Sequence, residues 1–449
     1  MKKKLIALFL TLAMGMALCA CGGSSAATTT AETTTAAETT STEAAETEAE
    51  TEAEEETTEE ETVAKKGTIK IGHLLDLTGV EAISGAITQK AFNFACELLE
   101  KQTGWEFEVV EGDCQSDSDK AANQAEQMIS QGCQVIFGPT QIGHKKAVLA
   151  YVADNQVPVV LYNGSPSAFT GGMLFSNDMI IAMGGGTSAF PTVMADYLYN
   201  EVGLRTVFCF KQDTVGGNNY VDPFVTCFTA MGGTVIDNIA VPQGTNDWSA
   251  YLTTIMNSDA EAIVGWTSAS DTLAFYKEWY TSGAYEKLPV YGTMHGGFTD
   301  SFVLDELDEK IADAIIENGA LAPICYSYTV DTEANNEFVD AWVEEFGEVP
   351  LGNNFPGATY QALKCLTEAL DAVGTDVTAS ELVAAMRAAD FDGPEGHTVF
   401  KDGAIVATKD IHVVKVVRLE DGSINYEVQK TYEQVDPIGY NYDGTNYIG

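Results

Sequence analysis

The chain has 449 residues and a formal net charge of −43, because 66 acidic residues outnumber 23 lysines and arginines. This excess of negative charge argues against a nucleic-acid partner and against a basic surface that binds membranes. Residues 64–449 alone carry a net charge of −33, and their length predicts two or three folded units that each bury a core.

The first residues have the pattern of an export signal. Lysines at positions 2–4 precede an apolar run over residues 5–18, which is too short for a comfortable membrane span. The run ends in the sequence LCAC, which resembles the bacterial lipobox with Cys21 as its last residue; an ordinary signal peptide with an incidental cysteine is the alternative. We expect residues 1–20 to be a lipoprotein signal peptide, and the protein to be exported and lipid-anchored through Cys21 to the outer face of the cell membrane.

A long segment of low complexity follows the signal. Residues 24–62 contain only Ser, Ala, Thr and Glu, so they have almost no apolar surface to bury and cannot offset the entropy of ordering. The 13 glutamates repel one another and extend the segment. We expect residues 21–66 to be a lipidated, disordered tether that holds a folded body clear of the membrane. A glycosylated stalk is the alternative, because threonine is abundant.

From residue 67 onward, short apolar runs alternate with segments of helical periodicity. Strands are predicted at Thr68–Leu75, Phe107–Glu111, Val135–Phe137 and Pro158–Leu161. Helices are predicted at Ser84–Lys101, Ser118–Gln131 and Lys145–Asn155, with Ser116, Asp117 or Ser118 as the cap of the second. This order implies a parallel sheet covered by helices on both faces.

The alternation starts again after the three glycines at 184–186. Helices are predicted at Ser188–Val202, Asp222–Met231, Trp248–Asn257 and Thr272–Ser282, and strands at Thr206–Phe210, Thr234–Ala240, Ala262–Trp266 and Pro289–Gly292. Two more helices, Ala334–Phe346 and Gly357–Val373, precede short strands from Val399 onward, including Ile411–Val417. The sequence therefore predicts an α/β protein with two doubly wound parallel sheets. Such sheets bind ligands beyond the carboxyl ends of their strands, so we expect a ligand cleft between the two lobes.

Seven cysteines remain in the body once residues 1–21 are set aside. The number is odd, so at least one thiol is free, and apolar neighbours indicate small buried side chains. The sequence leaves open whether Cys114 and Cys133 form a disulfide. No cysteine pair has C-x₂-C spacing and the histidines show no ligand spacing, so neither a metal nor another cofactor is expected.

Several motifs resemble the leucine/isoleucine/valine-binding family of ABC-transporter solute-binding proteins, which has the type I periplasmic-binding fold. The resemblance covers most of residues 67–420. Its motifs are Ile69-Lys70-Ile71-Gly72, Asp76-Leu77-Thr78-Gly79, Asp113-Cys114-Gln115-Ser116-Asp117, Val135-Ile136-Phe137-Gly138-Pro139, Gly232-Gly233-Thr234-Val235, Asn246-Asp247-Trp248-Ser249, Tyr360-Gln361-Ala362 and Gly393-Pro394-Glu395-Gly396. Each motif is weak alone, and their order and spacing together are specific.

The resemblance implies two lobes joined by three crossovers, with the ligand cleft between them. Lobe one comprises residues 67–187 with 322–405, lobe two residues 188–321 with 406–432, and residues 433–449 form a C-terminal tail. The implied function is a binding protein, expected to be monomeric, that closes on a small molecule and delivers it to a membrane permease driven by a paired ATPase. A receptor that presents its ligand to a membrane sensor is the alternative. We expect no enzyme, because no nucleophile–base pair or metal set emerges.

The resemblance also places ligand contacts on loops that follow strands of lobe one. These contacts are Ser84 in the first loop, Thr140, Gln141 and Ile142 after the third strand, and Asn163, Gly164 and Ser165 after the fourth. In amino-acid-binding members a serine after the third strand helps to hold the ligand carboxylate. Here Ile142 or Gly143 takes that place, and Thr140 and Gln141 are expected to supply hydrogen bonds instead.

In lobe two the expected contacts are Val215, Trp266, Ser268, Met294 and His295, and plain packing is the alternative for each. Amino-acid binders often place a carboxylate after the strand that ends here at Gly292, where it pairs with the ligand ammonium. This loop contains no acid, and a buried ammonium without a counter-charge is costly. The sequence therefore favours an amide or a flat aromatic solute, with a branched-chain amino acid still open.

Overall fold

The structure is a computed structural model that describes residues 63–79, 81–163, 178–184, 187–294, 297–351, 354–419 and 422–436. The predicted signal peptide, Cys21 and nearly all of the predicted tether lie outside these ranges. Within them, no helix is both long enough and apolar enough to span a membrane.

The first sheet has five parallel strands in the order β2-β1-β3-β4-β5. The strands are β1 (Gly67–Leu75), β2 (Trp105–Asp113), β3 (Val135–Phe137), β4 (Val159–Leu161) and β5 (Ile180–Ala182). The first four confirm the predicted strands. The strand β5 was not predicted, because three apolar residues carry no periodicity that separates a strand from a buried helix.

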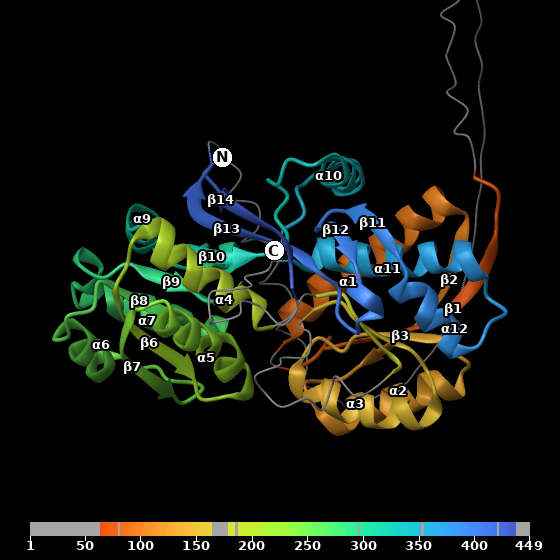
Figure 1. Cartoon of the computed structure of the whole chain (residues 1–449), viewed down its shortest axis with the longest axis horizontal. Helices are drawn as coiled ribbons and strands as arrows, with labels where there is room; N and C mark the ends of the chain where they lie inside the picture. The colour runs from red at the N-terminus through yellow and green to blue at the C-terminus, as the bar shows by residue number, and fades with distance from the viewer. Residues whose placement is uncertain are drawn as a thin grey trace, which may run out of the picture. The chain divides into compact units, whose positions relative to one another are not determined.

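Helices cover both faces of this first sheet (Figure 1). One face packs against α1 (Ala82–Thr103), α11 (Phe355–Val373) and α12 (Ala379–Arg387), and the other against α2 (Ser118–Ser130) and α3 (Ile142–Asn155). Asp117 caps α2 by accepting hydrogen bonds from the backbone N–H groups of Asp119 and Lys120. Because both faces of the sheet are covered, the second half of β1, residues 71–75, is buried at every position rather than at every other one.

The second sheet has seven strands in the order β14-β13-β10-β9-β8-β6-β7. These strands are β6 (Thr206–Gln212), β7 (Thr234–Val241), β8 (Ala262–Trp266), β9 (Val290–Gly292), β10 (Leu321–Ile324), β13 (Lys409–Arg418) and β14 (Ile424–Val435). The strands from β7 to β10 are parallel, whereas β13 and β14 are antiparallel to their neighbours. The predicted parallel sheet is thus confirmed from β7 to β10. The closing strands, whose direction the sequence did not predict, add an antiparallel edge, because the short connection between β13 and β14 permits only an antiparallel hairpin.

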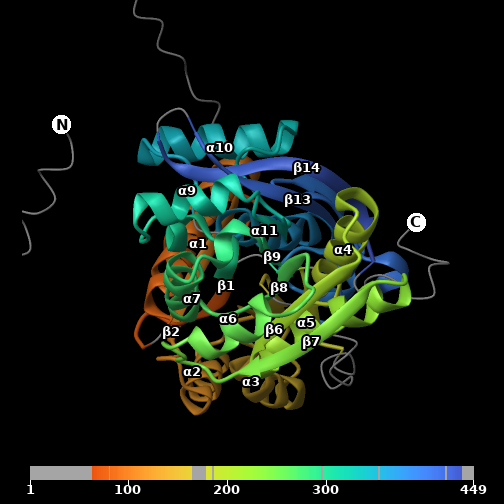
Figure 2. The ribbon, with the colours of Figure 1, turned by 90° about the vertical axis from the view of Figure 1, so that its left-hand side faces the viewer.

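Two groups of helices cover the second sheet (Figure 2). One face packs against α4 (Ala189–Asp196) and α5 (Val215–Ala230), and the other against α6 (Ser249–Met256), α7 (Ala269–Thr281) and α9 (Glu309–Glu317). A π-helical turn extends α4 over Tyr197–Val202, and a short helix α8 covers Ser301–Leu304. The helix α5 starts well before the predicted Asp222, because the Thr214 hydroxyl accepts a hydrogen bond from Gly217 N–H and caps a glycine-rich first turn.

The chain crosses three times between the elements of the two sheets. The crossovers lie between β5 and α4, between β10 and α10 (Glu333–Phe346), and between the hairpin of β11 (Asp390–Gly393) with β12 (Gly396–Val399) and β13. The strand β10 pairs in the second sheet, although the predicted lobe one resumes at residue 322. The strand β14 runs to Val435, into the segment predicted as a tail. The other lobe boundaries stay predictions.

The seven body cysteines are all free and buried. They are therefore small buried side chains, as predicted, and the disulfide between Cys114 and Cys133 that the sequence left open is not formed.

Candidate functional site

The loops expected to hold the ligand begin at one edge of the first sheet. Leu75 of β1 lies opposite Asp113 of β2, and His73 of β1 lies opposite Phe137 of β3. The carboxyl ends of β1, β2 and β3 therefore meet at this edge, where open parallel sheets bind ligands. Ser84 lies just beyond it, half-buried in the first turn of α1.

The loop after β3 offers polar groups to this edge. Thr140 and Gln141 are half-buried between β3 and α3, and Ile142 is the first residue of α3, with its side chain outside the described set. The Gln141 carbonyl accepts the backbone N–H of Lys145 at 3.1 Å. The Gln141 side-chain nitrogen is buried and has no hydrogen-bond partner among the described residues. A ligand acceptor would satisfy this donor.

Lys145 is a charged residue at this edge that the sequence prediction missed. It is only 1% exposed, and its ammonium donates a hydrogen bond to the backbone carbonyl of Asn163. It thus links the loop after β3 to the loop after β4, both of which are expected to contact the ligand. Burial lowers the pKa of Lys145 to about 7, because an apolar environment disfavours the ammonium.

The apolar periodicity of α3 indicates from the sequence that Lys145 is buried. Lys145, Val148, Leu149 and Val152 recur at helical spacing on α3, and all four are buried. A lysine in line with such an apolar stripe is unusual, because lysine is almost never fully buried without a partner. The stripe therefore singles out Lys145 over its exposed neighbour Lys146.

The loop after β4 is described only in part. Asn163 is half-buried, while Gly164 and Ser165 lie outside the described residues. The Tyr162 side chain points into the lobe core, where it is 1% exposed and its hydroxyl lies 3.1 Å from Nε2 of His73. Tyr162 therefore packs behind this edge of the sheet.

Three expected residues lie at the carboxyl ends of β6 and β8. Val215, the first residue of α5, is 61% exposed, and Trp266 is the half-buried last residue of β8. The Trp266 ring packs edge-on against Tyr220, with the ring centroids 4.8 Å apart. Ser268 directly precedes α7 (Ala269–Thr281), and its hydroxyl accepts a hydrogen bond from the Gln212 side-chain nitrogen at 2.9 Å. This edge combines aromatic surface with a hydroxyl that can still donate.

The last two expected contacts follow β9. Met294 is 2% exposed and belongs to the apolar cluster formed by α4, α5 and the sheet, so packing accounts for its position. His295 lies outside the described residues. Its role as a ligand contact stays a prediction.

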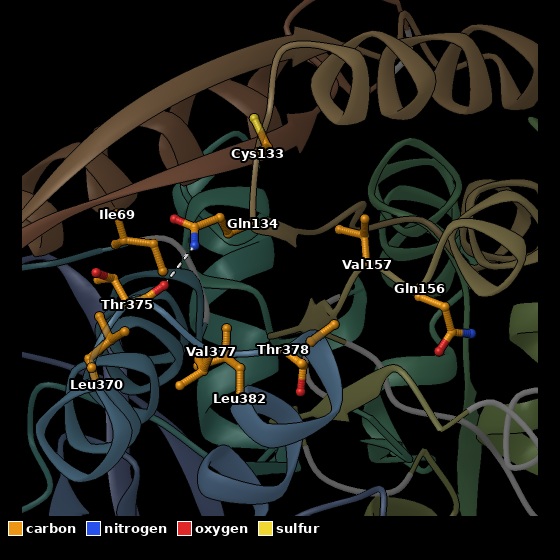
Figure 3. Close-up of a pocket in the computed structure, with 12 residues that line it drawn as sticks. Ile69, Cys133, Gln134, Gln156, Val157, Leu370, Thr375, Val377, Thr378 and Leu382 are labelled. Carbon is orange, nitrogen blue, oxygen red and sulfur yellow. Dashed lines mark hydrogen bonds between the residues drawn. The ribbon is translucent and has the colours of Figure 1, made fainter.

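A surface pocket of about 180 Å³ lies at the opposite, amino-terminal edge of the first sheet (Figure 3). Ile69 near the start of β1, Gln134 before β3 and Val157 before β4 line it from the sheet, and the segment between α11 and α12 closes it. The Gln134 side-chain nitrogen donates a hydrogen bond to the Thr375 carbonyl across the pocket, at 3.1 Å (Figure 3). None of the described residues that line this pocket is charged, and ligands of open parallel sheets bind at the other edge, so we do not assign the ligand to it.

Comparison with known families identifies the chain. A family model described as periplasmic binding protein matches residues 68–423. The chain belongs to this family. The match supports the predicted type I periplasmic-binding fold and the leucine/isoleucine/valine-binding group of ABC-transporter substrate-binding proteins. Members of the family are extracytoplasmic solute-binding proteins rather than enzymes.

Individual relatives of this periplasmic binding protein are distant but cover most of it. A Leu/Ile/Val-binding protein homolog from Brucella suis is 22% identical over 375 residues, which are 82% of this chain and 93% of the relative. An ABC transporter substrate-binding protein from Sphaerobacter thermophilus is 24% identical, with a TM-score of 0.74 over 83% of this chain and 99% of the other. A solute-binding protein from Rhodopseudomonas palustris, solved with 3,4-dihydroxybenzoic acid, is 21% identical, with a TM-score of 0.71 over 82% of this chain and 98% of the other. At these identities the solved structures support the fold alone.

Proposed function

We propose that this chain is the solute-binding lipoprotein of an ABC importer and that its ligand is a small organic carboxylate. The observation that carries the ligand class is the buried ammonium of Lys145, held between the two loops expected to contact the ligand. Delivery to a permease follows from the family role, and the lipid anchor follows from Cys21 and its lipobox-like surroundings.

The energetics of Lys145 favour an anionic ligand. Burial lowers the pKa of Lys145 to about 7, so the ligand-free protein bears a desolvation cost for this cation. A carboxylate placed against the ammonium would offset that cost through a charge-assisted hydrogen bond. The Gln141 side-chain nitrogen lies in the same loop region and can donate to the second carboxylate oxygen.

The remaining features favour an aromatic acid over an α-amino acid. The loop after β9 has no acid to pair with an ammonium, whereas Trp266 with Tyr220 supplies aromatic surface at the edge of the second sheet. Two Rhodopseudomonas palustris relatives were solved with 4-hydroxybenzoate and benzoate, while a Streptococcus pneumoniae relative was solved with isoleucine. Both ligand types share the carboxylate that Lys145 would bind.

A thermal-shift series on the full chain tests the ligand class, because a ligand present at 100 times its Kd adds about 2.7 kcal/mol to the stability of the native state. The series compares 4-hydroxybenzoate, benzoate, leucine and isoleucine with benzamide, the neutral counterpart of benzoate. We expect the aromatic carboxylates to raise the melting temperature and benzamide to leave it unchanged. Equal stabilisation by benzamide would remove the carboxylate from the proposal, and stronger stabilisation by leucine would restore an amino-acid ligand.

A further inference from the structure

Three potential metal ligands of different chemistry converge in the first lobe. Asp76 follows β1, Cys114 follows β2, and His144 lies in the first turn of α3, which follows β3. One ligand atom from each, a carboxylate oxygen, a thiol sulfur and an imidazole nitrogen, lie within 4.8 Å of one another. All three side chains are buried, with exposed fractions of 1%, 0% and 3%.

The register of the sheet explains why these residues meet. Leu75 and Asp113 are paired, so the next residues, Asp76 and Cys114, lie side by side where β1 and β2 end. The Cys114 backbone N–H donates to the Leu75 carbonyl at 2.8 Å, which extends this pairing by one step. The strand β3 lies on the other side of β1 and brings the start of α3, with His144, to the same edge. The segments that follow three neighbouring strands thus contribute one ligand each.

The facing atoms of Asp76 and His144 are buried and make no hydrogen bond to any residue that the structure describes. Oδ1 of Asp76 accepts the backbone N–H of Ser116 at 2.7 Å, which fixes the carboxylate and leaves Oδ2 toward His144. Oδ2 of Asp76 and Nδ1 of His144 are 3.6 Å apart, and among the described residues neither has a hydrogen-bond partner. Buried polar atoms without hydrogen-bond partners are rare in proteins, and an ion or a water between these two atoms would satisfy both.

We propose that Asp76, Cys114 and His144 bind one zinc ion beneath the ligand-binding edge of the first lobe. Carboxylate, thiolate and neutral imidazole are all zinc ligands, with metal–ligand distances of roughly 2.0–2.3 Å. Tetrahedral zinc at those distances separates its ligand atoms by roughly 3.5 Å, close to the 3.6 Å between Asp76 and His144. Zinc binding releases the Cys114 thiol proton to solvent, and the two anionic ligands then neutralise the divalent charge.

The electrostatic surroundings favour a cation at this position. Burial and the Asp76 carboxylate raise the pKa of Glu81, which shows that acidic groups crowd this edge. A bound zinc would connect the loop after β1 to the first turn of α3. His144 in that turn lies three residues after Gln141 and directly before Lys145. The site would therefore hold in place the loops that the proposed ligand contacts, whatever that ligand is.

Cobalt(II) titration of the full chain tests this site, because a cobalt–thiolate bond gives a near-ultraviolet charge-transfer band that carboxylate and imidazole sites lack. The reduced chain is first freed of metal with a chelator. We expect one Co²⁺ per chain, a thiolate band, and displacement of the cobalt by one equivalent of Zn²⁺. Absence of the thiolate band in the native chain would overturn the proposal without any variant, and would leave a simple Asp76–His144 ion pair.

Variants locate the site. Cys114→Ser should abolish the thiolate band, and Asp76→Asn and His144→Gln should each weaken Zn²⁺ binding by more than about 10-fold, since even outer-shell changes cost that much. Cys133→Ser, at another buried cysteine of the same lobe, and His397→Gln, beside the exposed Asp390 and Asp392, should leave binding unchanged. A band that persists in Cys114→Ser or disappears in Cys133→Ser would place the metal elsewhere.

Discussion

Replacement of Lys145 by methionine is expected to stabilise the ligand-free protein while weakening ligand binding. The drop of the Lys145 pKa from 10.5 to about 7 means that the folded state loses about 4 kcal/mol at pH 7 relative to an unperturbed lysine. Methionine fills a similar volume and removes this cost. It also leaves the Asn163 carbonyl without the lysine donor, which costs about 1–3 kcal/mol. The net gain at pH 7 is about 1–3 kcal/mol.

The gain should depend on pH with a definite sign. Between pH 7 and pH 10.5 the unfolded chain binds the Lys145 proton and the folded chain does not, so the stability of the native protein rises with pH in this window. At pH 10 the remaining cost is about 1 kcal/mol, and the advantage of Lys145→Met is gone. Urea denaturation of the ligand-free native chain and the variant at both pH values measures this difference.

Ligand affinity is the second readout of the same variant. Loss of a buried, hydrogen-bonded charge partner costs about 2–5 kcal/mol, so the affinity for the carboxylate ligand should fall by about 30-fold or more. Lys146→Met is the matched control, because Lys146 is the exposed neighbour on the same helix and should change stability by no more than about 0.5 kcal/mol. A Lys145→Met variant that is less stable at pH 7 and binds the ligand normally would refute the reasoning and make Lys145 a structural residue.

Three further predictions concern pH, the crossovers and the anchor. The affinity of the native chain for a carboxylate ligand should be constant from pH 5 to pH 7 and fall about tenfold per pH unit above 7, because binding needs protonated Lys145. Calorimetry that finds the same affinity at pH 7 and pH 9 would contradict this. Glu395→Gln should lower the free energy of unfolding, measured by urea denaturation, by about 3–5 kcal/mol, because it leaves the buried Lys409 ammonium without the carboxylate that lies 2.5 Å from it. The control Glu106→Gln removes a partner from an exposed ion pair and should lower it by less than about 1 kcal/mol. Cys21→Ala should abolish lipid labelling of the chain and release it from the membrane fraction, and unchanged membrane association would count against the lipobox interpretation.

The sequence alone determined the elements of the fold that depend on local pattern. β3 is apolar because both faces of a central parallel strand are covered, so the run Val135–Phe137 was predicted at its observed bounds. The alternation of strands and helices then indicated two wound sheets, and ordered motifs from Ile69 to Gly396 indicated the family. These features are local, and local features can be read along the chain.

Only the tertiary structure decided which polar groups lie together. Asp76, Cys114 and His144 are far apart in sequence and show no metal-ligand spacing, yet the register of three neighbouring strands brings them to one buried edge. The apolar stripe of α3 marks Lys145 as a buried lysine, but only the packing of α3 places its ammonium against the Asn163 carbonyl. Burial and strand order are properties of the whole fold, so only the folded chain shows which polar residues lie together and which charges are buried.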